Sequence, residues 1–158
     1  EGTTAIQAND LVGRKTSRDG GQTALAIAGQ VQATEKALLA HGAADAKAMA
    51  LRLGAARQAF VDVVQFVADQ SKASPNAVFA GSVPYLMLAG NLMAGWQMAR
   101  AMLVALEHLA GARDTAFMQA KITTARFYAD HILTRAPGMR DAIVDGADSV
   151  NALALDSY

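Results

Sequence analysis

The apolar residues of one long segment recur three and four positions apart, and this spacing limits what the chain can fold into. In the segment after Asp45, the recurring positions are Leu53, Ala56, Phe60, Val63 and Val67. Such a seam lies along one face of an α-helix and packs against a neighbouring helix. No alternating run of Val, Ile, Thr and Tyr indicates a strand, and about a quarter of the 158 residues are alanine, the best helix former. We therefore expect an all-α fold.

The usual start and stop residues divide the chain into segments. We expect helices over residues 4–15, 22–40, 115–135 and 139–155, a helix after Asp45 that includes Leu53 to Val67, and a long helix from Pro75 to Gly111. The turn-prone run 17–21 is expected to form a boundary. Long helices joined by short loops pack as antiparallel neighbours. The chain should therefore form an up-and-down bundle of four or five antiparallel helices, preceded by a short helix.

Several residues are expected to set the helix ends. Ser74 precedes Pro75, which suits an N-cap followed by proline at the first helical position. Pro84 should kink the long helix or mark its real start. Asp45 and Asp114 are expected to cap the helices that follow them. The run Ala136-Pro137-Gly138 is expected to end the helix before it.

Composition argues against several classes of protein. Fourteen basic and 14 acidic side chains give a net charge of zero and a pI near 7.1, which leaves no field to hold nucleic acid. With no cysteine, nothing demands an oxidising compartment, so a cytoplasmic location is the default expectation. No secretory signal is visible. Residues 73–99 are uncharged, but scattered polar residues and Pro84 favour a helix buried in a bundle, and membrane contact is disfavoured.

The candidate catalytic and metal-binding motifs are weak when taken from the residues alone. Three glutamates and three histidines lack the Glu-x-x-His spacing of a di-iron bundle, so no metal site is expected and the histidines are interpreted as structural. No Gly-x-Ser-x-Gly elbow occurs, and residues 13–16 lack the glycine spacing of a phosphate loop. Lys121, Arg126 and Asp130 are interpreted as a charged helix flank with an Arg126–Asp130 pair. Trp96 and the nearby methionines could line an apolar pocket, but core packing is the preferred interpretation.

The first residues change this picture. Glu1, Gly2, Thr3, Ile6 and Gln7 match a Glu-Gly-Thr-x-x-Ile-Gln motif, and in this the segment resembles the acyl-CoA dehydrogenases. In that family the motif stands at the mouth of the last helix of the catalytic core.

Later landmarks are similar to a longer subfamily that adds a helical C-terminal domain, typified by the methylthiopropionyl-CoA dehydrogenases. These landmarks are Val83-Pro84-Tyr85-Leu86, Gly90, Gly95-Trp96, Ala116-Phe117, Lys121 and Ala125-Arg126-Phe127-Tyr128. The resemblance thus implies that residues 1–18 end a catalytic core and that residues 22–158 form an appended bundle domain.

The resemblance implies α,β-dehydrogenation of an acyl-CoA thioester by an FAD enzyme. Glu1 would be the catalytic base, Gly2 would allow a tight entry to the helix, and Thr3 would approach the flavin dinucleotide. Ala5 departs from the glutamine of many relatives, so the contact to the flavin adenosine that this glutamine makes in them is not implied here. An electron-transfer flavoprotein would be the redox partner, and the enzyme would be a homo-oligomer. This polypeptide alone should neither hold FAD nor turn over.

Three roles compete for the bundle: an assembly face between subunits, a lid over the acyl pocket, and a membrane-contacting module. Assembly is favoured, because the alanine-rich last helix and the stretch around Trp96 offer apolar surface. The alternative from another class is a non-catalytic helical interaction domain whose first residues match by chance.

Overall fold

The computed structural model describes residues 2–150 and 152–157. Its α-helices are α1 (Thr4–Asp10), α2 (Gln22–His41), α3 (Ala44–Gln70), α4 (Pro75–Ala80), α5 (Ser82–Ala110), α6 (Thr115–His131), α7 (Ala136–Val144) and α8 (Ala147–Val150). A π-helix, Leu11–Thr16, continues α1, and short 3₁₀ turns cover Ser17–Asp19, Leu133–Arg135 and Leu155–Ser157. The described residues form no strand, and the all-α prediction is confirmed.

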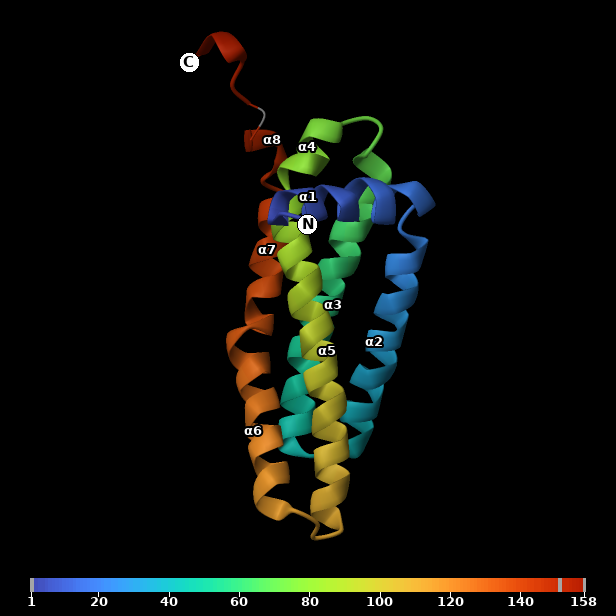
Figure 1. Ribbon diagram of the computed structural model, residues 1–158, viewed down its shortest axis with the longest axis vertical. Coiled ribbons are helices and arrows are strands. Elements are labelled where there is room, and N and C mark those ends of the chain that lie inside the picture. The colour runs from blue at the N-terminus through green and yellow to red at the C-terminus, as the bar shows by residue number, and fades with distance from the viewer. Residues whose placement is uncertain (1, 151, 158) are drawn as a thin grey trace.

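The long helices form four antiparallel columns (Figure 1). α2, α3 and α5 supply three columns, and α6 continued by α7 supplies the fourth. α3 and α5 each contact the other three columns. The expected up-and-down bundle is therefore present, with α4 as a short bridge between α3 and α5.

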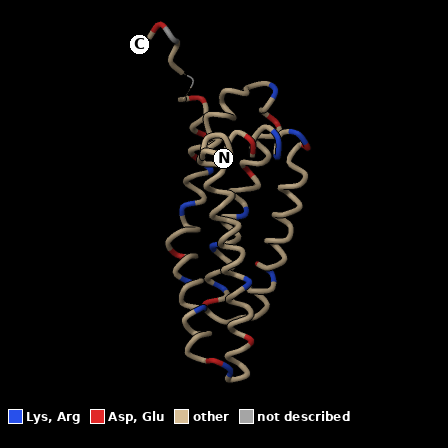
Figure 2. Tube along the Cα trace, viewed as in Figure 1, with Lys and Arg blue, Asp and Glu red and all other residues tan. Residues whose placement is uncertain are grey.

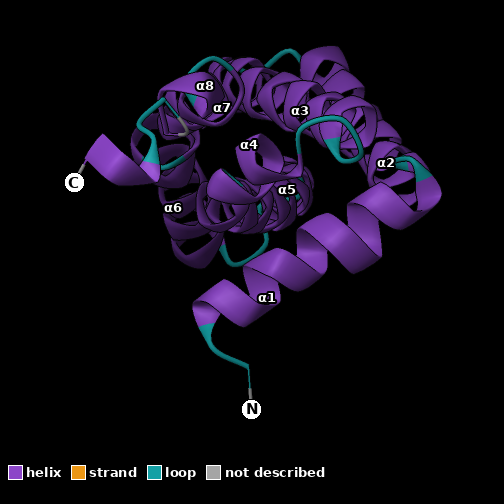
Figure 3. Cartoon of the chain, turned by 90° about the horizontal axis from the view of Figure 1, so that it is seen from above, coloured by secondary structure: helices purple, strands orange, loops and turns teal. Residues whose placement is uncertain are grey.

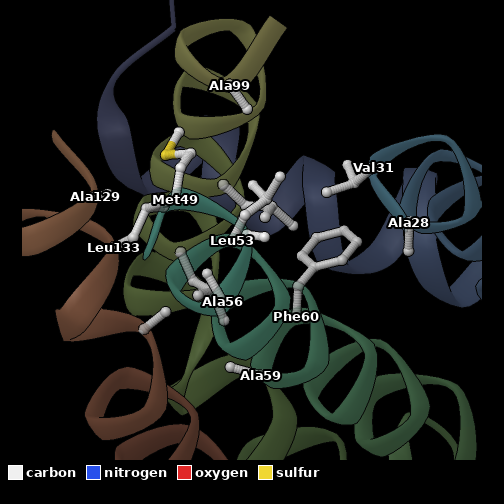
Figure 4. Close-up of a cluster of buried hydrophobic side chains, with 14 of the residues drawn as sticks. Ala28, Val31, Met49, Leu53, Ala56, Ala59, Phe60, Ala99, Ala129 and Leu133 are labelled. Atoms are coloured by element: carbon white, nitrogen blue, oxygen red, sulfur yellow. The ribbon is translucent and has the colours of Figure 1, made fainter. Parts of the chain in front are cut away.

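The core follows the apolar seam of α3. Met49, Leu53, Ala56, Phe60 and Val63 are all buried, and their neighbours come from α2, α5, α6 and the turn after α6 (Figure 4). Burying a leucine or phenylalanine side chain stabilises a fold by about 2 kcal/mol. The spacing of three and four residues predicted this helix and the face of it that is buried.

Two glycines let the helices approach closely. A Cβ at Gly95 of α5 would lie 2.6 Å from Leu133 Cδ2, and a Cβ at Gly81 would lie 2.8 Å from Ile143 Cγ2. Both leucine and isoleucine side chains are buried. Because Gly95 and Gly81 have no side chain, Leu133 and Ile143 of the fourth column can pack closely against α5 and the residue before it.

Most predicted helix starts are confirmed. α2 begins at Gln22 and ends at Gly42, whose φ of 79° is the left-handed conformation that favours glycine. The long helix breaks at Gly81 and restarts at Ser82, so Pro84 stands in the first turn, where its missing N–H has no intrahelical partner to lose. Pro84 therefore marks the real start of α5.

The predicted caps and the last two helices are wrong in detail. Ser74 and Asp114 stand at cap positions without a side-chain cap hydrogen bond, and Asp45 lies inside the first turn of α3. Ala136-Pro137-Gly138 begins α7 instead of ending α6, because Pro137 falls in the first turn of a helix, where proline is tolerated. The helix predicted over 139–155 is broken: α7 ends at Val144, and the short α8 follows the turn at Asp145 and Gly146.

The N-terminal segment crosses one end of the bundle (Figure 3). It runs from Thr4 to Asp19 as an α-helix, a π-helix and a 3₁₀ turn without interruption. Gly20 and Gly21 then adopt φ values of 63° and 80°, and α2 starts down the bundle. The two left-handed glycines thus make the sharp change of direction between the crossing segment and the first column.

Charged residues of both signs are interspersed along the bundle (Figure 2). Within the described residues, no helix combines the length and the hydropathy required to cross a membrane.

Candidate functional site

The motif at the start of the chain is described only in part. Glu1, the expected catalytic base, lies outside the described residues. Thr3 is exposed, and its Oγ1 accepts a hydrogen bond from the Ile6 N–H at 3.4 Å, which caps α1. A Cβ at the exposed Gly2 would lie 1.8 Å from Gln7 Nε2, so a larger residue would displace the flexible Gln7 side chain. The sequence did not indicate this capping role of Thr3.

The segment that carries the motif is docked firmly on the bundle. Ala8, Val12 and Thr16 follow one another at intervals of four, and each is at most 1% exposed. Val12 belongs to the same apolar core as α3 and α5. Any residue held at the start of α1 is therefore connected to the bundle through a packed helix.

Two hydrogen bonds fix the far end of the crossing segment. The hydroxyl groups of Thr16 and Tyr85 lie 2.9 Å apart in the buried interior, and Ser17 Oγ donates to Ser71 Oγ at 2.9 Å. Burial raises the pKa of Tyr85, and its hydrogen bond to Thr16 partly opposes that rise. The first bond joins the segment to α5 and the second joins it to the residue that follows α3.

Asp19 caps the next column. Its two carboxylate oxygens accept from the Gly21 and Thr23 N–H groups, each at 3.0 Å. Hydrogen bonds from Thr23 lower the pKa of Asp19 below its ordinary value. The run 17–21, expected from the sequence to be a turn-prone boundary, therefore contains the residue that caps α2.

An arginine joins two columns at the other end of the bundle. Arg126 Nε donates to Asp130 at 2.6 Å and Arg126 Nη1 donates to Asp45 at 3.1 Å, while Arg52 lies 3.7 Å from Asp130. The pKa of Arg126 is raised, chiefly by its hydrogen bond to Asp130. The predicted Arg126–Asp130 pair is confirmed. Lys121 makes a different contact, because its ammonium lies over the Phe117 ring, 4.9 Å from the ring centre.

Two of the histidines, His41 and His131, are the last residues of α2 and α6. His131 stacks on Phe127 with ring centres 4.4 Å apart. Among the described residues, no group of three His, Cys, Asp or Glu side chains could hold a metal ion.

Trp96 links two columns and is largely used inside the bundle. Its Nε1 donates to Thr34 Oγ1 of α2 at 2.7 Å, and Met102 is fully buried. Met102 therefore belongs to the core, Trp96 is half-buried and packs against it, and Met93 lines a small cavity. On the same helix Met87 and Val104 remain 50% and 51% exposed.

One exposed apolar surface, between α2 and α3, was not predicted from the sequence. Leu39 and Leu51 are 52% and 68% exposed and line a groove of about 590 Å³ between α2 and α3. Leu51 falls outside the three-and-four pattern of α3, and that departure is a signal that could have found it, whereas Leu39 follows the buried Leu38 and its spacing does not set it apart.

Comparison with known proteins assigns the class. A family model described as acetyl-CoA dehydrogenase C-terminal like matches residues 27–154. That range is most of the chain, and the chain belongs to this family.

Two individual relatives are acyl-CoA dehydrogenases. The chain is 46% identical to the 3-methylmercaptopropionyl-CoA dehydrogenase of Ruegeria pomeroyi over 155 residues, which is 98% of the chain and 26% of that protein. It is 35% identical over 158 residues to the broad-specificity linear acyl-CoA dehydrogenase FadE5 of Mycobacterium tuberculosis, covering 90% of the chain and 24% of that protein. The chain thus spans about a quarter of the length of these relatives.

Proposed function

We propose that the chain is the C-terminal portion of an FAD-dependent acyl-CoA dehydrogenase that removes hydrogens from the α- and β-carbons of an acyl-CoA. The observation that carries the proposal is the identity with two acyl-CoA dehydrogenases over 98% and 90% of the chain. The proposed division places the end of the catalytic core at residues 1–18 and an appended bundle at residues 22–158.

Glu1 is the proposed base that takes the α-proton of the thioester. A carboxylate in reach of a weak carbon acid gains basicity when the acyl chain excludes water around it. The packing of Ala8, Val12 and Thr16 supports this role, because it gives the helix that follows Glu1 a fixed place against the bundle. A catalytic group that is held in position loses little entropy at the transition state.

Gly2 and Thr3 fit the proposed flavin contact. Both are exposed, and Thr3 Oγ1 uses only its acceptor capacity toward Ile6, so its hydroxyl proton remains available to a phosphate or hydroxyl of the cofactor. Bound FAD would supply the hydride acceptor for the β-carbon. The other flavin contacts must come from the rest of the enzyme, so the 158-residue chain should purify colourless, and a stoichiometric yellow flavin would contradict this.

The bundle is proposed to serve assembly of a homo-oligomer. The α2–α3 groove with Leu39 and Leu51 supports this role, since single surface leucines are ordinary but two beside one apolar groove favour a partner. An electron-transfer flavoprotein is the proposed electron acceptor, and the cytoplasm is the proposed location.

Replacement of the proposed base tests the catalytic role. In the full-length enzyme, Glu1→Gln should slow reduction of the bound flavin by acyl-CoA by about 10³-fold, because general-base catalysis contributes on that order. Stopped-flow absorbance measures the rate, and the visible spectrum measures flavin retention. Glu107→Gln, which changes an exposed glutamate on α5, is the control and should reduce the flavin at the wild-type rate. Wild-type reduction by Glu1→Gln would refute the assignment.

A further inference from the structure

A small apolar cavity lies where the N-terminal segment meets the bundle. Its volume is about 180 Å³. Its apolar walls come from the π-helix, α2, α3 and α5, and are formed by Leu11, Ala24, Ile27, Phe60, Ala89 and Met93. The cavity thus has one wall on the crossing segment and the others on three columns of the bundle.

The buried polar atoms of the cavity need no water. Its buried polar lining is the pair of hydroxyl groups of Thr16 and Tyr85, which bond to each other at 2.9 Å, and the exposed Thr23 and Lys15 stand at its rim. An apolar cavity of about 150 Å³ stays dry and binds benzene, so this one matches a hydrocarbon group of about six carbons. The cavity therefore favours a hydrocarbon group over ordered water.

One cation stands at the rim. Lys15 lines the cavity and is exposed, and within residues 2–150 and 152–157 no ion pair is made by its ammonium. The nearby Asp19 does not line the cavity, and its carboxylate is occupied by the Gly21 and Thr23 N–H groups. An ammonium beside an apolar opening matches a ligand whose hydrocarbon part ends in an anion.

We propose that this cavity binds a monocarboxylate with about six carbons, whose hydrocarbon part fills the cavity and whose carboxylate pairs with Lys15. The inference depends only on the geometry of this chain and goes beyond the dehydrogenase function. Because the ligand would touch both the crossing segment and the bundle, its binding would stabilise the docked position of that segment.

Hexanoate is the probe, titrated into the full-length enzyme with ¹³C-methyl methionine. The methyl signal of Met93, assigned with Met93→Leu, should shift and saturate, while the signal of Met118 on α6 should not move. No saturable shift at Met93 below about 50 mM hexanoate would overturn the proposal. Turnover is not measured, so failure of the proposed catalytic role would leave this result unaffected.

Two kinds of variant separate the apolar and the ionic parts. Ala24→Leu and, independently, Ala89→Leu should fill the cavity and weaken hexanoate binding at least about tenfold, while cooperative thermal unfolding shows that each still folds. Lys15→Gln should weaken hexanoate binding about threefold and leave benzene binding unchanged, and Lys121→Gln, on α6 and not on a wall of the cavity, should change neither. Wild-type affinity in both filled variants overturns the site, and equal effects of Lys15→Gln on hexanoate and benzene overturn the carboxylate assignment.

Discussion

The two terminal segments of the described chain lie at the same end of the bundle, yet only one of them is part of the core (Figure 1). In the N-terminal segment, Ala8, Val12 and Thr16 are buried and hydrogen bonds run to α5 and to Ser71. In the C-terminal segment, Ala147 is buried, but Val150 and Leu153 are 66% and 63% exposed. Both segments have helix-forming sequences, so helix propensity alone does not decide which one packs.

What distinguishes them is the surface each one meets. The N-terminal segment presents small or branched residues every fourth position to a wall that contains Tyr85, with which Thr16 exchanges a hydrogen bond. Among the described residues, α8 makes its main contacts with α4 and α7 and not with the long columns α2, α3 and α5. Short helices in water depend on such tertiary partners, and the predicted helix over 139–155 accordingly ends early.

The largest effect is expected when a charge is placed in each segment. Val12→Asp should lower the free energy of unfolding of the 158-residue chain by about 4 kcal/mol, because an unpaired carboxylate would be buried in the core. Val150→Asp, on an exposed side chain, should change it by less than about 0.5 kcal/mol. Urea unfolding measures both. Similar losses in the two variants would abolish the contrast between the segments.

The next test concerns the glycines that join the N-terminal segment to α2. Gly21→Ala should cost about 2 to 3 kcal/mol, since its φ is 80° and a Cβ would lie 2.6 Å from Val64 Cγ1. Gly20→Ala meets nothing within 4 Å and should cost about 1 kcal/mol for its left-handed φ of 63° alone. Thermal unfolding of the pair separates steric overlap from backbone strain. Equal costs would show that Val64 moves aside without penalty.

The buried hydroxyl pair gives a smaller effect. Tyr85→Phe leaves the Thr16 hydroxyl unsatisfied and should lower stability by about 1.5 kcal/mol. Adding Thr16→Val removes the orphaned hydroxyl, so the double variant should be more stable than the sum of the single variants predicts. A double-mutant cycle in urea measures the coupling. A coupling energy of zero would mean that the hydrogen bond does not hold the segment.

The smallest effect depends on pH. Asp19 has a lowered pKa in the folded chain, so its capping interaction contributes stability above the ordinary pKa of 3.8 and loses it as pH falls through the lower folded value. Asp19→Asn should therefore reduce the difference in melting temperature between neutral and strongly acidic solution. Asp156→Asn in the C-terminal segment is the matched control and should leave that difference unchanged. Parallel profiles for wild type and Asp19→Asn would rule out this contribution.

The sequence predicted the columns well because the information that specifies them is local. Leu53, Phe60 and Val67 define a buried stripe by spacing alone, and all three are buried. The ends of α6 and α7 were not predictable in this way. Proline after Ala136 is equally compatible with stopping one helix and with starting another, and the difference depends on whether Leu133 finds the space beside Gly95.

In the candidate site, too, the local features were predictable from the sequence and the long-range contacts were not. The Glu-Gly-Thr motif can be read from consecutive residues, whereas the Thr16–Tyr85 bond joins positions 69 residues apart. No local pattern pairs a threonine in the crossing segment with a tyrosine on α5. The resemblance identified the motif, but only the folded chain reveals what anchors the segment that bears it.

The π-helix Leu11–Thr16 determines how this stretch responds to a change in its length. A π turn accommodates more residues than an α turn, and deleting one residue would let the stretch relax to an ordinary α-helix. The π stretch holds about one residue more than an α-helix of the same rotation, so the residues after the deletion would keep nearly the same direction and Thr16 would still face Tyr85. A lost codon here should therefore be tolerated better than one in α1, where no π turn takes up the change and Val12 and Thr16 would rotate by about 100° around the axis.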